Sequence, residues 1–373
     1  MDKLKVGVIG CGVGRFHVAG YSKLPNVEIA ALAGLDEVRC QKLAAEYGIP
    51  RLFTDYRDLL ALPEIAAVSV CVPNSLHAPV AAAAFAAGKH VLCEKPLAAT
   101  VAEGEAIVQA ARRARRKLMV SFNYRFRGDS QTLKRHVAAG GLGEVYYVKA
   151  GWLRRSGIPG IGSWFTCQAQ AGGGPLIDLG VHVLDLALWF LDYPPVVAIS
   201  GATYAKFGPR GKGFWGGDEA PSRPPFREVR RDGASRFPSG TAGCDVEDLA
   251  TAFVRLAGGA TMAVETSWAS YTSAGDDYHV HLFGDEGGAE LNVRNYTQKD
   301  TLRFFGELAG VPTEMRPLYP EIGSHEAAIR HFVECVAEDR EPTASGEQGL
   351  AVLRLIAAIY QSAATGREVV LAE

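Results

Sequence analysis

Three side chains in this chain of 373 residues could carry acid–base chemistry: Asp178, His182 and Lys95. Asp178 and His182 lie four residues apart after a run of three glycines, so a helix that begins there sets the carboxylate and the imidazole on one face. From residue 176 to 191 the only other charged side chain is Asp185, which predicts a buried helix with a narrow polar stripe. Such a pair is either a core histidine satisfied by a carboxylate or a site of proton transfer.

Lys95 belongs to the tripeptide Glu94-Lys95-Pro96, which follows a short apolar run at residues 90–93. The proline keeps Lys95 out of helical geometry, so the lysine can be held rigidly at the end of a strand. The same tripeptide is also common on solvated surfaces, and it identifies no site by itself.

The first element able to position these groups is a glycine turn near the N-terminus. An apolar run at residues 4–10 is followed by Gly10, Gly12 and Gly14 and by a helical pattern to residue 24, which predicts strand, turn and helix. Such a turn can bind a pyrophosphate with the free amides of the helix. Arg15 stands where the third small residue of the usual fingerprint would fall, and a glycine turn without a ligand is the alternative.

The rest of the first third alternates between two kinds of segment. Apolar runs at residues 27–33, 66–72, 90–93 and 117–122 are separated by helical patterns at 37–47, 79–87 and 100–115. This alternation predicts a doubly wound parallel sheet, a Rossmann domain. Ligands bind beyond the carboxyl ends of such strands, where Val72, Pro73, Asn74, His77 and Glu94 would lie.

The pattern changes near residues 122–123, which predicts two domains, 1–122 and 123–373. A helix at 131–139 precedes alternating strands at 144–152, 196–204, 250–256, 261–268, 278–283 and 289–293. We expect an α+β domain with an open, mostly antiparallel sheet, covered on one face by the helix at 175–191 and the C-terminal helices. The aperiodic stretch 207–244 is a lid, an oligomer contact or a disordered insertion, and the sequence does not choose among them.

Composition restricts the class of protein. Basic residues number 39 and acidic residues 41, which argues against a nucleic-acid or membrane-surface protein. We expect no apolar run of membrane-spanning length and no signal peptide, because the N-terminus enters a strand at once. The seven cysteines show no C-x-x-C spacing, so we expect reduced thiols, no metal site and a cytoplasmic location.

Several motifs occur together in order, and together they resemble the glucose-fructose oxidoreductase / inositol dehydrogenase (Gfo/Idh/MocA) family. They are the glycine turn, Pro73-Asn74-x-x-His77, Glu94-Lys95-Pro96, Phe122-Asn123-Tyr124-Arg125-Phe126, the run from Gly172 to His182, and the tail segments at 331–335, 340–342 and 346–350. The resemblance implies an NAD(P)-dependent oxidoreductase that acts on a hydroxyl carbon of a sugar, sugar derivative or cyclitol. It also implies a homodimer or homotetramer whose subunits pack through the open sheet face, and catalytic roles for Lys95, Asp178 and His182.

These roles can be stated as chemistry. His182, whose unperturbed pKa suits neutral pH, would accept the hydroxyl proton while Asp178 orients the ring. Lys95 would stabilise the developing negative charge on the reacting oxygen. Alternatively, Lys95 takes the proton and His182 relays it.

Cofactor choice departs from the usual pattern. Gly34 stands where an acidic residue commonly ends the second strand and binds the adenosine ribose. NAD is favoured if Asp36 reaches the ribose, whereas NADP is accepted if Arg39 or Arg15 meets a 2′-phosphate. The alternative role for Asp36 is to cap the helix at 37–47. We favour NAD, with NADP as the alternative.

The complete candidate sets follow from these arguments. The expected cofactor-binding residues are Gly10, Gly12, Val13, Gly14, Arg15, Phe16, Asp36, Arg39, Val72, Pro73, Asn74, His77, Glu94, Lys95 and Asn123. The expected substrate-binding residues are Tyr124, Arg125, Trp152, Arg154, Arg155, Trp164 and Tyr278. Two other functions stay open: a non-catalytic sensor of dinucleotide and sugar, and a redox-assisted glycoside-cleaving enzyme that recycles its NAD.

Overall fold

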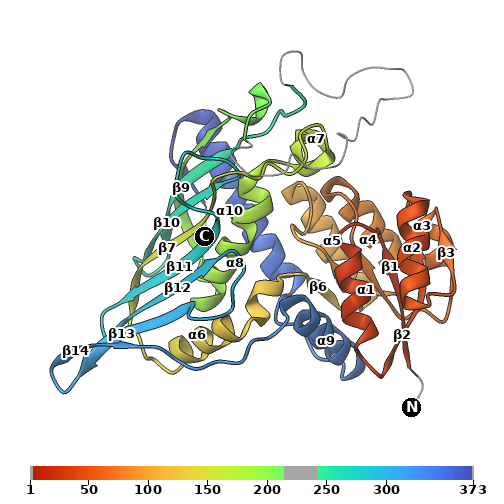
Figure 1. Cartoon of the computed structure of the whole chain (residues 1–373), viewed down its shortest axis with the longest axis horizontal. Helices are drawn as coiled ribbons and strands as arrows, with labels where there is room; N and C mark the ends of the chain where they lie inside the picture. Colours follow the sequence, from red (N-terminus) through yellow and green to blue (C-terminus); the bar gives the residue numbers. More distant parts are fainter. Residues whose placement is uncertain (1–2, 214–241, 372–373) are drawn as a thin grey trace. The chain divides into compact units, whose positions relative to one another are not determined.

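The computed structural model describes residues 3–213 and 242–371. The chain forms two compact units (Figure 1): Met1–Phe126 with Ile322–Leu353, and Arg127–Glu321 with Arg354–Glu373. The first unit therefore includes a segment near the C-terminus, which the expected division at residues 122–123 assigned to the second domain. Most of the 207–244 stretch, including Trp215, lies outside the described residues.

The first unit is a parallel sheet of six strands in the order β3-β2-β1-β4-β5-β6. The strands are β1 (Leu4–Ile9), β2 (Val27–Ala33), β3 (Leu52–Phe53), β4 (Ala67–Val70), β5 (His90–Cys93) and β6 (Leu118–Val120). The helices are α1 (Gly14–Ser22), α2 (Glu37–Tyr47), α3 (Tyr56–Leu60), α4 (His77–Ala86), α5 (Val101–Ala114) and α9 (Ser324–Ala337). Because the order runs outward from β1 in both directions, the predicted doubly wound sheet is confirmed.

Local sequence explains why these elements begin and end where they do. The side chains of Val6, Val8 and Val68 are fully buried, as expected of strands covered on both faces. Thr100 and Glu103 form a reciprocal capping box at the start of α5. Gly48 ends α2 in left-handed geometry with a φ of 65°. Short elements such as β3 and α3 were not predicted, because they carry too few residues for a periodic pattern.

The second unit is a sheet of nine strands in the order β14-β13-β12-β11-β7-β10-β9-β8-β15. The strands are β7 (Val145–Arg154), β8 (Val196–Tyr204), β9 (Leu249–Leu256), β10 (Thr261–Ser267), β11 (Asp276–Gly284), β12 (Gly288–Arg294), β13 (Leu302–Leu308), β14 (Val311–Met315) and β15 (Val369–Val370). Only β7 and β10 pair in parallel, so the mostly antiparallel sheet is confirmed.

The helices α6 (Gly128–Ala138) and α8 (Val181–Phe190) contact this sheet, α8 against β7 and β11 and α6 against β12. The expectation that both C-terminal helices cover the sheet was wrong for α9, which packs on α1 in the first unit. In α10 (Gly346–Thr365), Ile359 approaches Gly201 of β8, so the second half of that helix contacts the sheet.

The predicted helix at 175–191 begins as a π-helix, Leu176–Gly180, and continues as α8. It belongs to a longer segment, Gln168–Phe190, which is long and apolar enough to cross a membrane, since its most apolar 18-residue window has a mean hydropathy of 1.3. The expectation of no such run was therefore wrong. Since 89% of its apolar window is buried inside the protein, this segment is a core helix of the second unit.

The cysteines also differ from expectation. Cys11 and Cys40 form a disulfide, so the prediction of seven reduced thiols was wrong for these two. They are 29 residues apart in the chain and meet because the turn after β1 packs against the first turns of α2. The other five cysteines are buried free thiols. Within the described ranges, no group of three or more His, Cys, Asp or Glu residues could hold a metal ion.

Candidate active site

The glycine turn of the first unit uses its three glycines in different ways. Gly10 has a φ of +105°, and an ideal Cβ there would lie 2.1 Å from the carbonyl oxygen of Cys71. A Cβ on Gly14 would lie 3.1 Å from Val8 Cγ1, so Gly14 lets α1 pack closely on β1. Close helix–strand packing is the role of the third glycine in the dinucleotide fingerprint. Gly14 therefore fills the packing role of the third glycine, one residue earlier than in the usual fingerprint, where Arg15 stands.

At Gly12, by contrast, no close contact within the described structure excludes a larger side chain. The nearest atom to an ideal Cβ there is Arg39 Nη1, at 4.0 Å. The space above Gly12 is thus open at the start of α1, where the first amides lack intrahelical partners. An open cradle beside a guanidinium fits the pyrophosphate of a dinucleotide. Phe16 follows on α1, is 42% exposed, and stacks on His325 of α9 at 5.1 Å.

The end of β2 differs from a usual ribose site. An ideal Cβ on Gly34 would lie 2.7 Å from the Sγ atoms of both Cys11 and Cys40, so the disulfide occupies the space of any larger side chain. Asp36 accepts a hydrogen bond from the Arg39 amide at 3.0 Å and pairs with its guanidinium at 3.3 Å. The capping interpretation of Asp36 is therefore confirmed. Its side chain stays 41% exposed and keeps lone pairs for a ligand.

A buried network supports the strand end that carries Lys95. His17 Nε2 lies 2.8 Å from Glu94 Oε1, and His17 Nδ1 lies 2.9 Å from Ser69 Oγ. Burial alone would raise the pKa of Glu94, but hydrogen bonding and charge from His17, with His325 and Lys95, lower it to about 2. A fixed carboxylate thus precedes Lys95. No role was predicted from the sequence for His17 or His325. Their positions on helices of this unit are the only feature of the sequence that could have indicated one.

Two other predicted cofactor residues brace the same edge of the sheet. His77 is fully buried, and its ring nitrogens lie 2.8 Å from the Pro96 oxygen and 2.9 Å from the Val72 oxygen. Burial lowers the pKa of His77. Asn123 donates to Ser324 Oγ at 2.9 Å. Both side chains therefore connect strand ends and loops, which gives them a structural role whether or not they touch a cofactor.

In the second unit, aromatic residues flank Asp178 and His182. Trp268 donates its indole N–H to Asp178 Oδ2 at 2.9 Å. The ring of Trp152 lies 5.8 Å from that of His182 and 4.9 Å from that of Tyr278. Asp178 falls in the π-helical turn and His182 in the first turn of α8. π-helical turns are frequent at functional sites.

The rings of Trp152 and Tyr278, called here the aromatic wall, adjoin an ion pair of Asp276 and Arg154, called the polar fork. Asp276 accepts from Trp152 Nε1 at 2.6 Å and from Tyr296 Oη at 2.6 Å, and it pairs with Arg154 at 2.9 Å. Asp276, Tyr296 and Trp268 were not predicted, because nothing in their local sequence distinguishes them. The arrangement offers aromatic faces beside charged hydrogen-bonding groups, which suits a ligand with apolar faces and hydroxyl edges.

The remaining substrate candidates do not join this cluster. Arg125 is fully buried in the first unit, where it donates to the Thr343 carbonyl and to Gln348 Oε1 at 2.7 Å. These contacts give Arg125 a structural role, and its prediction as a substrate residue stays a prediction. Tyr124 also belongs to the first unit, Arg155 is exposed, and Trp164 stacks on Phe165 at 3.8 Å.

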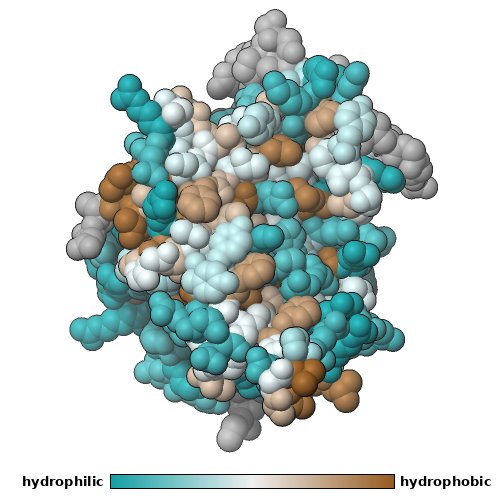
Figure 2. All heavy atoms as spheres, turned by 90° about the vertical axis from the view of Figure 1, so that its left-hand side faces the viewer, coloured by the Kyte–Doolittle hydropathy of each residue, from teal (hydrophilic) through white to brown (hydrophobic). Residues whose placement is uncertain are grey.

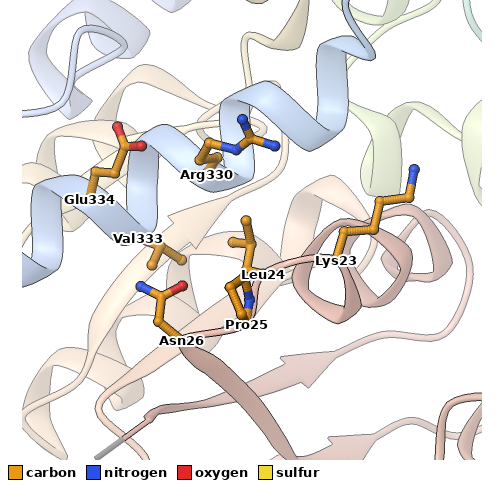
Figure 3. A pocket seen from close by; sticks show the side chains of 7 residues that line it. All are labelled: Lys23, Leu24, Pro25, Asn26, Arg330, Val333 and Glu334. Atoms are coloured by element: carbon orange, nitrogen blue, oxygen red, sulfur yellow. The ribbon is translucent and has the colours of Figure 1, made fainter. Parts of the chain in front are cut away.

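One surface groove of about 230 Å³ lies elsewhere in the first unit (Figure 3). It lies between the loop after α1 and helix α9, and Lys23, Leu24, Pro25, Asn26, Arg330, Val333 and Glu334 line it. Because α1 spans nine residues from Gly14, the groove is about 13 Å along that helix from the glycine turn. It is therefore not the dinucleotide site.

Comparison with known families identifies the class. A family described as "Oxidoreductase family, NAD-binding Rossmann fold" matches residues 4–122, and its "C-terminal alpha/beta domain" matches residues 134–371. The chain belongs to this family, the glucose-fructose oxidoreductase / inositol dehydrogenase family. It is an NAD(P)-dependent oxidoreductase with an NAD-binding Rossmann domain.

Relatives cover nearly the whole chain. D-glucoside 3-dehydrogenase of Escherichia coli K12 is 32% identical, over 99% of this chain and 97% of its own. Levoglucosan dehydrogenase of Pseudarthrobacter phenanthrenivorans is 30% identical, over 81% of this chain and 76% of its own. A solved levoglucosan dehydrogenase in complex with NADH and L-sorbose matches all of both chains with a TM-score of 0.84 at 25% identity.

Proposed function

We propose that this oxidoreductase transfers a hydride between a nicotinamide cofactor and a hydroxyl carbon of a sugar, sugar derivative or cyclitol. The observation that carries the proposal is the cluster in the second unit: His182 beside the Trp152–Tyr278 wall, with the Asp276–Arg154 fork adjoining it. Dehydrogenases of glucosides and levoglucosan among its relatives support a carbohydrate substrate.

The side chains have distinct roles in this proposal. Bound NAD would accept the hydride from the carbinol carbon. His182 accepts the hydroxyl proton, and Asp178, fixed by the indole of Trp268, orients the imidazole and stabilises its charged form. Lys95 follows the Glu94 carboxylate, which fixes its strand end, and stabilises negative charge on the reacting oxygen. Lys95 as the base, with His182 as relay, is the alternative assignment.

A substrate screen tests the function. Purified protein is incubated with glucosides, anhydrosugars, free aldoses and cyclitols, each with NAD and with NADP, and reduced nicotinamide is measured by absorbance. Net accumulation with at least one of them is the expected result. Product formation without net reduced cofactor would instead indicate the glycoside-cleaving alternative, and dinucleotide binding without turnover of any compound would indicate the sensor.

Cofactor choice gives a first prediction. Asp36→Asn keeps an effective helix cap but removes the charge that would repel a 2′-phosphate. We expect the ratio of kcat/KM for NADP to that for NAD to rise roughly tenfold, about 1.4 kcal/mol. Arg39→Ala is the matched variant, because it leaves the Asp36 charge beside the turn and should lower NADP use. An unchanged ratio in both variants would place selectivity elsewhere, with Arg15 the first residue to test.

We also propose assembly through the open face of the nine-stranded sheet, as a homodimer or homotetramer. Figure 2 shows this side of the molecule, where apolar and polar residues are intermixed. Tyr147 and Phe283 lie there 5.3 Å apart between ring centres, and Phe253 and Tyr204 are 38% and 44% exposed. Light scattering on the native chain and on Phe253→Lys tests this, and a monomeric native chain would contradict it.

For its location we propose the cytoplasm, supported by the five buried free thiols. Cys11–Cys40 weakens that support. Alkylation of the protein in intact cells, followed by counting of its free thiols, would decide whether Cys11 and Cys40 are oxidised or reduced in the cell. The near balance of 39 basic and 41 acidic residues supports small-molecule partners rather than nucleic acid or a membrane.

A further inference from the structure

The three-glycine turn before Asp178 packs against two groups from distant parts of the second unit. An ideal Cβ on Gly173 would lie 2.0 Å from Tyr360 Oη, and one on Gly174 would lie 2.0 Å from the Glu247 carbonyl oxygen. Neither position can carry a larger side chain without displacing these groups. The glycines therefore serve to admit Tyr360 and Glu247 to the start of the helix.

Glu247 binds that start directly. Its Oε2 accepts from the Gly174 amide at 2.8 Å, and its Oε1 accepts from the Leu176 amide at 3.2 Å. Pro175, between them, has no amide hydrogen. Tyr360 donates to the same Oε1 at 2.8 Å. One carboxylate, only 8% exposed as a residue, thus satisfies two of the donors that a helix start leaves without partners.

This cap is linked to Asp178 by two routes. The carbonyl of Gly174, whose amide Glu247 holds, accepts from the Asp178 amide at 3.0 Å. The second route starts at Asp248, the residue after Glu247, whose backbone carbonyl accepts a hydrogen bond from the Trp268 amide at 3.0 Å. The indole of Trp268 in turn donates to Asp178 Oδ2. The backbone and the carboxylate of Asp178 are therefore both positioned from the segment that contains Glu247 and Asp248.

We infer that Glu247, held by Tyr360, is a positioning residue that sets Asp178 and His182 for proton transfer and does so fully only when its carboxylate is ionised. This inference rests on the proposed function of those two side chains. An ionised carboxylate accepts all three hydrogen bonds, whereas a protonated one carries a donor and can accept fewer of them. Protonation of Glu247 therefore loosens the start of the helix.

The protonation change of Glu247 falls near neutral pH. Burial raises the pKa of Glu247 to about 7, although Tyr360 and the Gly174 and Leu176 amides favour the ionised form. The titratable groups facing it are Tyr360 from α10, whose pKa burial raises well above its usual value, and Cys244, whose pKa burial raises to about 11. Both stay neutral near pH 7, so Glu247 is the group that changes charge.

The experiment compares Glu247→Gln, Tyr360→Phe and the native chain. We expect Glu247→Gln to lower kcat roughly tenfold, to leave the Kd of NAD unchanged, and to remove one ionisation near pH 7 from the kcat profile while the ionisation of the proton-accepting base remains. Tyr360→Phe, which deletes one donor to the ionised form, should move that ionisation to higher pH. Glu286→Gln, at an exposed position in the turn between β11 and β12, is the matched control and should change none of these.

A second readout needs no turnover. Hydrogen exchange of the peptide spanning 172–182 should be faster in Glu247→Gln than in the native chain, and unchanged in Glu286→Gln. If no substrate is found but exchange is faster, the proposed function fails while the cap stands. A native pH profile and native exchange in a folded Glu247→Gln overturn the inference. If that variant does not fold, a native kcat profile in Tyr360→Phe overturns it.

Discussion

His182→Ala lowers kcat by roughly 10²-fold or more, the usual effect of removing an acid–base group, while the Kd of NAD stays close to native. The loss falls on kcat because the imidazole lies beside the Trp152 ring in the second unit, whereas the glycine turn belongs to the first. Steady-state kinetics with a substrate from the screen, together with calorimetric titration of NAD, measure both quantities.

The control for this variant is His136→Ala, on α6 of the same unit, where the imidazole stacks on Phe304 at 4.0 Å between ring centres. It should keep kcat near native, and near-native turnover in His182→Ala would remove His182 from the mechanism. Lys95→Arg then separates the two assignments of the base. It keeps the positive charge but does not deprotonate, so partial activity favours a charge-stabilising Lys95 and complete loss favours Lys95 as the base.

Gly12→Val abolishes measurable dinucleotide binding. Among the described residues, chain neighbours apart, the only atom within 4 Å of an ideal Cβ is Arg39 Nη1, at 4.0 Å, so the described structure has room for the side chain. The added methyl groups would instead occupy the space that the pyrophosphate needs. Calorimetry should show no heat of NAD binding, and the melting temperature should stay near that of the native chain.

Gly306→Val provides the matched control, because an ideal Cβ at Gly306 has nothing within 4 Å and the residue lies on β13 of the other unit. This variant should bind NAD as the native chain does. Unchanged affinity in a folded Gly12→Val would show that the turn is only structural and would falsify its assignment to the dinucleotide.

Regular elements could be predicted because their signals are local. β2 and α2 occur at the expected residues, since an apolar run ends at Gly34 and Asp36 caps the next helix. β13 and β14 were missed because their side chains are mostly half-buried or exposed and do not alternate clearly. The π-helical start of the Asp178 segment depends on groups far along the chain, and no local pattern indicates it.

The candidate site was found only in part for the same reason. Asp178 and His182 share one helix, so their spacing shows them together, whereas Glu247 is 73 residues from the Gly174 amide that it binds. Arg125 was predicted at the substrate as one of several amphipathic side chains suited to a hydroxyl-rich ring, yet the chain returns at residues 322–353 and buries it. Pairings between distant segments are decided by tertiary packing, which one sequence does not display.

The Cys11–Cys40 bond closes a loop that contains all of β2, the strand that ends beside the cofactor turn. Closing a loop of 29 residues removes conformational entropy from the unfolded chain, worth about 3–4 kcal/mol in the chain-entropy account. That is a large part of the roughly 5–15 kcal/mol by which a folded protein is stable. Among the described cysteines no other pair is bonded, so reduction removes this stabilisation from the dinucleotide-binding unit alone. The heat resistance of the first unit thus depends on the redox state of its surroundings, and that of the second unit does not.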